Sequence, residues 1–177
     1  TRNLPKNNLV TGKKSNDLFE ESFKFVLPGY NVRPLEMSGA IGIEQLKKLN
    51  GFIDERRSNF EYFASLFSNH PFIQIQKEIG LSSWFGFSMV LKENSPICRS
   101  ELINLLKEKN IECRPIVTGN FLKNKEVLEH FDFEVAGSVV NAEYIDVNGL
   151  FVGNHQVSIR KEIKYLADVI ESHIQNK

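Results

Sequence analysis

Apolar residues recur at helical spacing in the segment that follows Pro28-Gly29. Residues three or four positions apart share one face of a helix, so this pattern predicts a long helix or two helices in succession. Asn50-Gly51 offers a possible stop, but no proline follows and the stripe resumes in register, which favours one continuous or kinked helix. The stripe consists of Ile43, Leu46, Leu49, Ile53, Phe60, Phe63 and Phe67.

Apolar and polar residues alternate after this stripe, which is the period of a β-strand. Ile73 and Ile75 alternate with glutamines, and residues 85–91 continue the same alternation, so we expect two strands here. The short apolar stretches at about 111–117 and at 149–152 predict two more strands.

Two further helices are predicted between and after these strands. One has Leu102, Leu105 and Leu106 on a single face, with Ser95-Pro96 or Ser100 as its cap and Asn110 as its stop. The other follows Ser158 and ends the chain. Its apolar positions are Ile159, Ile163, Leu166, Ile170 and Ile174.

This order of elements predicts an α/β chain whose C-terminal part is a small α+β domain. A small antiparallel or mixed sheet covered by helices suits it. We expect residues 1–28 to form an N-terminal arm or loop, residues 29–70 a long linking helix, and residues 71–177 the C-terminal small domain.

The composition excludes several classes of protein. A hydrophobic fraction of 41% suits a soluble globular protein. Lys plus Arg equal Asp plus Glu at 22 each, so we expect no nucleic-acid partner, and no apolar run is long enough to indicate a membrane span. Cys98 and Cys113 form no CxxC pair, so we expect two buried, reduced thiols in a cytoplasmic protein and no metal site.

Asn31 and Arg33 place an amide and a guanidinium two residues apart, just before the long helix. An arginine can grip a phosphate through its planar fork, and a helix start adds unpaired N–H groups, so the pair indicates a phosphate site. The alternative is a turn in which Asn31 caps local backbone and Arg33 is solvated, and spacing alone favours this alternative.

The segment 112–120 sets an acid, Glu112, and a base, Arg114, before a polar tip at the end of a short strand, where ligand contacts often lie. The alternative is an ordinary ion pair of Glu112 with a neighbouring Lys or Arg and a turn at Gly119-Asn120. We assign no chemistry to His155 or to the charged run 54–57, which we expect to be a solvated helix face.

A longer run carries a resemblance to a known family. Residues 28–49, PGYNVRPLEMSGAIGIEQLKKL, continue through Arg57 and resemble the segment after the catalytic core of DegT/StrS-type sugar aminotransferases and their 3-dehydratase relatives. The agreement continues through 84–91 and 112–120 to the final helix. The resemblance implies the C-terminal part of an aspartate-aminotransferase-type enzyme (fold type I) with pyridoxal or pyridoxamine 5'-phosphate as cofactor, a nucleotide-sugar as substrate, and a homodimer that shares its site across the interface.

The resemblance also implies roles for particular residues. Asn31 matches the family asparagine that reaches the cofactor phosphate of the partner subunit, and Arg33 lies close to the same site. We therefore expect both residues to bind the cofactor. In that family an N-terminal domain supplies the proton-transfer residue, so we assign no catalytic residue and expect this chain alone to be inactive. The expected substrate-binding residues are Phe23, Glu112, Arg114, Thr118, Gly119 and Asn120.

The stretch after Arg114 separates two branches of the family. Aminotransferase members usually carry a Tyr-Pro-Leu-His-like stretch there, whereas this chain has Pro-Ile-Val-Thr-Gly-Asn, which looks like the 3-dehydratase branch. A lysine at the proton-transfer position bonds to the cofactor, while a histidine only moves protons, and that position is expected upstream of Thr1. We expect 3-dehydration in lipopolysaccharide or O-antigen-type biosynthesis, with a nucleotide-sugar aminotransferase or a non-catalytic interaction domain as alternatives.

Overall fold

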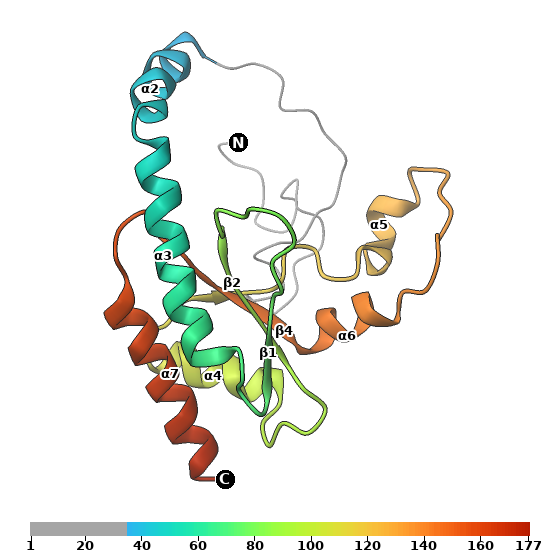
Figure 1. The fold of residues 1–177 in the computed structure, drawn as a ribbon. Coiled ribbons are helices and arrows are strands. Elements are labelled where there is room, and N and C mark those ends of the chain that lie inside the picture. The colour runs from blue at the N-terminus through green and yellow to red at the C-terminus, as the bar shows by residue number, and fades with distance from the viewer. Residues whose placement is uncertain (1–34) are drawn as a thin grey trace, which may run out of the picture.

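Two helices open residues 35–177, the part of the chain that the computed structural model describes (Figure 1). The first is α2 (Glu36–Leu46) and the second is α3 (Leu49–Phe67). The favoured single helix is therefore wrong, and the break lies at Lys47-Lys48 instead of Asn50-Gly51. Lys48 donates its backbone N–H to Gln45, three residues back, which tightens the end of α2. No residue of α2 is buried, so no packing among the described residues holds it in line with α3.

Four short strands form one antiparallel sheet in the order β1-β2-β4-β3. This confirms the antiparallel alternative of the predicted sheet and its four strand positions. The register sets Phe87 opposite Val152 and Arg114 opposite Phe151. The strands are β1 (Ile73–Ile75), β2 (Gly86–Leu91), β3 (Cys113–Arg114) and β4 (Gly149–Gly153).

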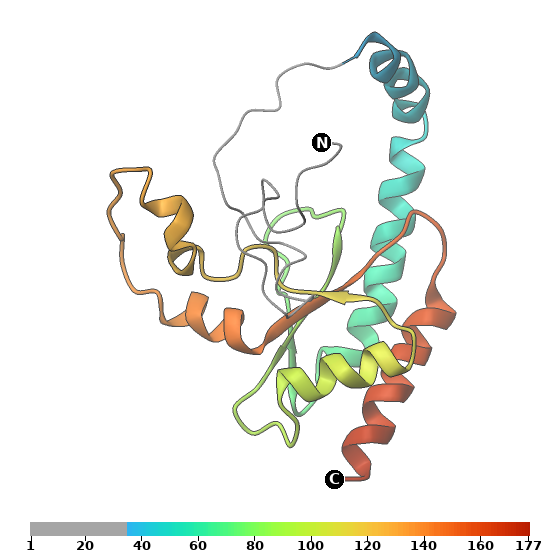
Figure 2. The same ribbon diagram turned by 180° about the vertical axis from the view of Figure 1, so that it is seen from behind.

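Three helices cover one face of the sheet. α3 and α7 (Arg160–Gln175) run side by side, and α4 (Arg99–Glu108) completes this layer (Figures 1 and 2). Alternate residues of β2 point into the core that the layer encloses, as the sequence pattern predicts. Phe87 stacks on Phe63 of α3 with ring centroids 4.6 Å apart. Other members of this core are Phe67, Met89, Leu91, Leu102, Leu106, Leu150, Ile163, Leu166 and Ile170.

The polar side chain of Asn59 is buried beside this core. Asn59 of α3 is fully buried and donates to the side chain of Asn154 and to the carbonyls of His155 and Val157, at 3.2, 3.1 and 2.8 Å. Its own oxygen accepts from Ile159 N–H at 3.1 Å. Asn59 thereby supplies hydrogen-bond partners to three backbone groups between β4 and α7.

Short helices fill the chain between β3 and β4, and they lie on the far side of the sheet from α3 and α7 (Figures 1 and 2). They are η1 (Phe121–Lys123), α5 (Lys125–Leu128) and α6 (Val140–Asn148). The residues we expected to bind cofactor, Asn31 and Arg33, lie outside the described residues, as do Phe23 and the arm 1–28. The predicted domain boundaries therefore stay a prediction.

The expected cap of α4 and the expected burial of the two cysteines are both wrong. The N-cap of this helix is Cys98, without a side-chain capping bond, while the Ser95 hydroxyl donates to the carbonyl of Ile97, 2.9 Å away. Because the cap lies at the surface, Cys98 is exposed, and Cys113 is only half-buried, so the prediction of two buried thiols is wrong. Asn110 does end the helix, with a left-handed φ of 56°.

Candidate functional site

The face of the sheet opposite the helix layer carries the polar side chains. Cys113 packs against the core, so its neighbour Arg114 points to the opposite face, beside Phe151 of β4. Ser88 and Val90 of β2 lie on this same face, because they alternate with the buried residues of that strand. We call this face of the sheet the open face.

Among the residues described, no helix is long and apolar enough to span a bilayer.

Glu112 and Arg114 line a pocket of about 290 Å³ at one end of the open face. Two nitrogens of Arg114, Nε and Nη2, donate to Glu112 Oε1 at 2.9 and 2.6 Å. The ion pair that we weighed as the alternative is therefore present. An exposed pair of this kind contributes about 0–1 kcal/mol, so exchanging it for a ligand contact costs little. The other residues that line this pocket are Arg56, Phe85, Phe151, Gly153 and Asn154.

Arg56 joins this pocket from α3, which the sequence did not indicate. Its Nη1 donates to the carbonyl of Trp84 at 3.2 Å, and Arg57 Nε donates to the carbonyl of Ser82 at 3.0 Å. The prediction that residues 54–57 form a solvated face is thus wrong for both arginines, which are half-buried and hold the loop before β2. Asn154 completes the junction by donating to the carbonyls of Arg56 and Trp84, both at 3.0 Å.

The predicted tip, residues 118–120, is a tight turn on the open-face side. Gly119 N–H donates to the carbonyl of Ile116 at 2.8 Å, and Val117 and Gly119 both have left-handed φ values, 46° and 59°. Asn120 is buried, and its amide donates to Glu143 Oε2 at 2.8 Å while its oxygen accepts from Leu122 N–H. The structure does not bring Thr118, Gly119 or Asn120 into the lining of the Arg114 pocket.

An ion triad links this turn region to α6. Lys123 Nζ lies 2.8 Å from Glu143 Oε1 and 2.6 Å from Asp146 Oδ2. The hydrogen bonds to Asp146 and then to Glu143 raise the pKa of Lys123 above its ordinary value. The pKa of Glu143 is lowered, chiefly by Lys123 and next by Asn120. Both shifts favour the charged forms of Lys123 and Glu143.

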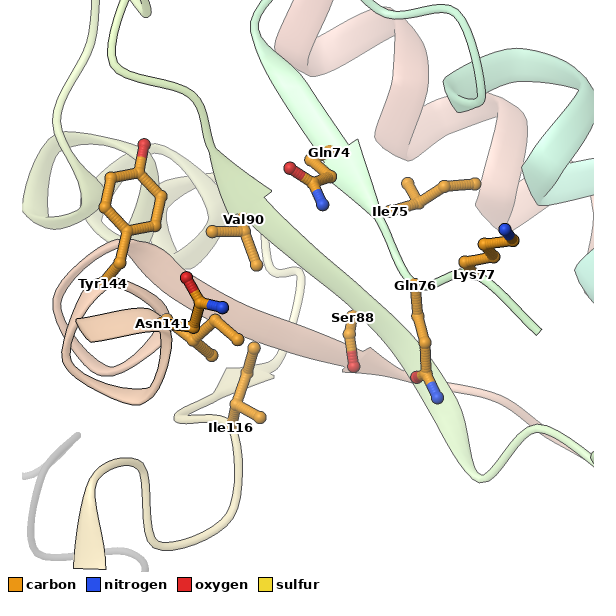
Figure 3. Close-up of a pocket in the computed structure, with 10 residues that line it drawn as sticks. Gln74, Ile75, Gln76, Lys77, Ser88, Val90, Ile116, Asn141 and Tyr144 are labelled. Atoms are coloured by element: carbon orange, nitrogen blue, oxygen red, sulfur yellow. The ribbon is translucent and has the colours of Figure 1, made fainter. Parts of the chain in front are cut away.

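A second pocket, of about 540 Å³, lies farther along the open face between β1, β2 and α6 (Figure 3). Its polar groups include the amides of Gln74, Gln76 and Asn141, the hydroxyl of Ser88 and the side chain of Lys77. Tyr144 lines it too and donates its hydroxyl to the carbonyl of Leu91 at 2.8 Å. The alternation that predicts the strands also places Gln74 and Ser88 on the face opposite the core.

The described residues contain no group of three His, Cys, Asp or Glu side chains that could hold a metal ion. What the open face offers instead is a carboxylate, two guanidinium groups and neutral amides. Such groups suit a ligand that is rich in hydroxyls and carries negative charge, because guanidinium binds anionic oxygens and amides pair with hydroxyls.

The sequence profile of the DegT/DnrJ/EryC1/StrS aminotransferase family matches residues 7–171. The chain belongs to this family. The resemblance identified from residues 28–57 and 112–120 is thereby confirmed.

Two relatives in the DegT/DnrJ/EryC1/StrS family are highly similar over 171 residues, or 97% of this chain. GDP-4-keto-6-deoxy-D-mannose 3-dehydratase of Yersinia pseudotuberculosis is 67% identical, and the protein of the same name from Escherichia coli O55:H7 is 64% identical. The chain spans 44% of the length of each relative.

A solved structure confirms the fold of this chain. It is the Escherichia coli GDP-4-keto-6-deoxy-D-mannose-3-dehydratase with bound hydrated PLP, which is 64% identical and superposes with a TM-score of 0.76. The match covers 95% of this chain and 43% of that protein. The fold is therefore that of the corresponding part of a fold-type-I enzyme, as predicted.

Proposed function

We propose that this chain is the C-terminal part of a 3-dehydratase that acts on a GDP-linked 4-keto-6-deoxyhexose. The observation that carries the proposal is the identity of 67% and 64%, over 97% of the chain, to two proteins that both bear this activity in their names. The dehydratase-like stretch after Arg114 supports the same branch. We place the protein in lipopolysaccharide or O-antigen-type biosynthesis, as a cytoplasmic homodimer.

The open face supports a role on the sugar side of the site. Glu112 offers a carboxylate acceptor and Arg114 offers paired N–H donors, and a sugar hydroxyl can use both in place of their ion pair. Arg56, whose Nη1 is fixed by the carbonyl of Trp84, adds positive charge to the same pocket. We propose that these groups orient the sugar, with Phe23 contributed by the partner subunit.

The cofactor in this proposal is pyridoxal or pyridoxamine 5'-phosphate. When bound, it supplies an electron sink for breaking the bond to the 3-hydroxyl. Asn31 is proposed to donate to its phosphate and Arg33 to place a positive charge nearby, while the described residues of the open face are assigned to substrate. This division leaves proton transfer to a residue outside this chain.

The test is an assay of the full-length protein that contains this chain, with GDP-4-keto-6-deoxymannose, pyridoxal phosphate and glutamate as amino donor. We expect a product that keeps its keto group and lacks the 3-hydroxyl, which mass spectrometry detects. A product that has instead gained an amino group would identify an aminotransferase. No product and no cofactor absorbance would favour the interaction-domain alternative and overturn the proposal.

A further inference from the structure

We propose that Lys123 is a positioning residue that fixes the turn 116–120 for binding the nucleotide-sugar. This inference rests on the proposed function and on the expectation that Thr118, Gly119 and Asn120 of this turn bind the substrate. Lys123 itself lines neither pocket of the open face, so its role is to hold other groups in place.

Glu143 and Asp146 of α6 each direct one carboxylate oxygen to Lys123 and the other to the turn. Glu143 gives Oε1 to Lys123, at 2.8 Å, and Oε2 to the Asn120 amide, also at 2.8 Å. Asp146 gives Oδ2 to Lys123, at 2.6 Å, and turns Oδ1 towards Gly119. Without the ammonium group, two carboxylates three residues apart on one helix would repel each other and change their orientation.

The backbone of the turn needs such support. Val117 is a β-branched residue with a left-handed φ of 46°, which costs on the order of 1–3 kcal/mol and persists only where the surroundings impose it. Arg99 also holds α6, because its Nη1 donates to the backbone carbonyl of Asp146 at 2.8 Å. The carboxylates therefore sit on a helix that is anchored independently of Lys123.

The same contacts connect two walls of the pocket in Figure 3. Ile116, at the start of the turn, lines one part of it, and Asn141 and Tyr144 of α6 line another. Lys123 joins the turn to α6, so its loss would let these walls separate. We therefore expect the effect on substrate binding to exceed the effect on the chemical step.

The experiment compares Lys123→Met and Lys123→Arg in the full-length protein. The Met variant removes the charge and keeps the length, while the Arg variant keeps the charge. Lys164→Met is the matched control, since Lys164 pairs with Asp168 on α7, on the other side of the sheet. Amide hydrogen exchange of residues 117–122 and steady-state kinetics with the GDP-sugar are measured for each.

We expect Lys123→Met to speed exchange in the turn and to raise KM by about tenfold with kcat within about twofold, the signature of lost binding. Lys123→Arg should restore most of both, and Lys164→Met should change neither. Unchanged exchange in Lys123→Met would overturn the positioning role. Faster exchange with unchanged KM would overturn the link to substrate. If wild type processes no nucleotide-sugar, the proposed function fails, and the exchange arm still decides whether Lys123 holds the turn.

Discussion

Asp146 Oδ1 occupies the space that a side chain at residue 119 would need: a Cβ added to Gly119 would lie 1.8 Å from it. Gly119 also has φ +59°, a conformation that other residues adopt only with strain. Position 119 therefore requires glycine for two reasons: its φ is left-handed, and Asp146 leaves no room for a side chain.

Gly119→Ala should lower the free energy of unfolding by about 1–3 kcal/mol, because backbone strain and the clash with Asp146 add. Gly137→Ala is the control, since Gly137 has φ +74° but open space around it, and should cost only the backbone strain. Urea denaturation measures both. Equal losses would show that the contact with Asp146 contributes nothing.

Asn59→Ala should be among the most destabilising single changes in the core, costing about 2–4 kcal/mol. It removes the donor to two backbone carbonyls and the acceptor for Ile159 N–H, and it empties a fully buried position. Asn176→Ala is the control, because Asn176 is exposed and its side-chain amide donates to the carbonyl of Ser172 at the end of α7. Thermal melting compares the two, and a similar loss in both would contradict the assigned role.

His70 should make stability depend on pH. Its ring is buried, its Nδ1 accepts from the N–H groups of Phe72 and Ile73, and Nε2 lies 3.1 Å from Glu171 Oε1 without forming an aligned hydrogen bond. Burial lowers the pKa of His70 below the ordinary 6.5, against the opposing effect of Glu171. The unfolded state then binds more protons than the folded state below pH 6.5.

The stability that neutral His70 contributes is therefore complete above pH 6.5 and declines as the pH falls through the lowered pKa. His70→Asn keeps an acceptor near Nδ1 and removes the titration. We expect the difference in free energy of unfolding between wild type and His70→Asn to shrink between pH 7 and pH 5. A constant difference over that range would contradict the prediction.

Arg114→Lys tests the assignment of the Arg114 pocket to substrate. A lysine keeps the charge but loses the pair of N–H groups that Arg114 presents, so KM for the GDP-sugar should rise by about tenfold in the full-length enzyme, or about 1.4 kcal/mol. Arg160→Lys is the control, since Arg160 is exposed at the start of α7 and bonds to the Ser58 hydroxyl. Equal KM values in wild type and Arg114→Lys would remove Arg114 from the site.

The regular elements were predictable because each depends on a local pattern. The alternation along β2 identified Phe87 as a core residue, and the spacing of Phe63 and Phe67 identified one face of α3. The break at Lys47-Lys48 was not predictable, because the apolar stripe crosses it in register and no Gly or Pro marks it.

The candidate site was predictable only in part. Glu112 and Arg114 are two residues apart, so their pairing follows from the alternation of a strand. Arg56 and Asn154 are 98 residues apart, and their contact exists only because the end of β4 meets α3. No spacing in the sequence encodes that meeting, which explains why Arg56 was assigned to solvent.

The order of the strands has a consequence for how the domain forms. β4 lies between β2 and β3 and pairs with both, whereas β1 pairs with β2 at one edge of the sheet. A chain growing from its N-terminus therefore makes β3 well before the strand that will hold it, and the sheet cannot close until about residue 153 has been synthesised. A stop codon placed just before β4 would remove less than a fifth of the chain. It would nevertheless leave β2 and β3 without the strand that joins them.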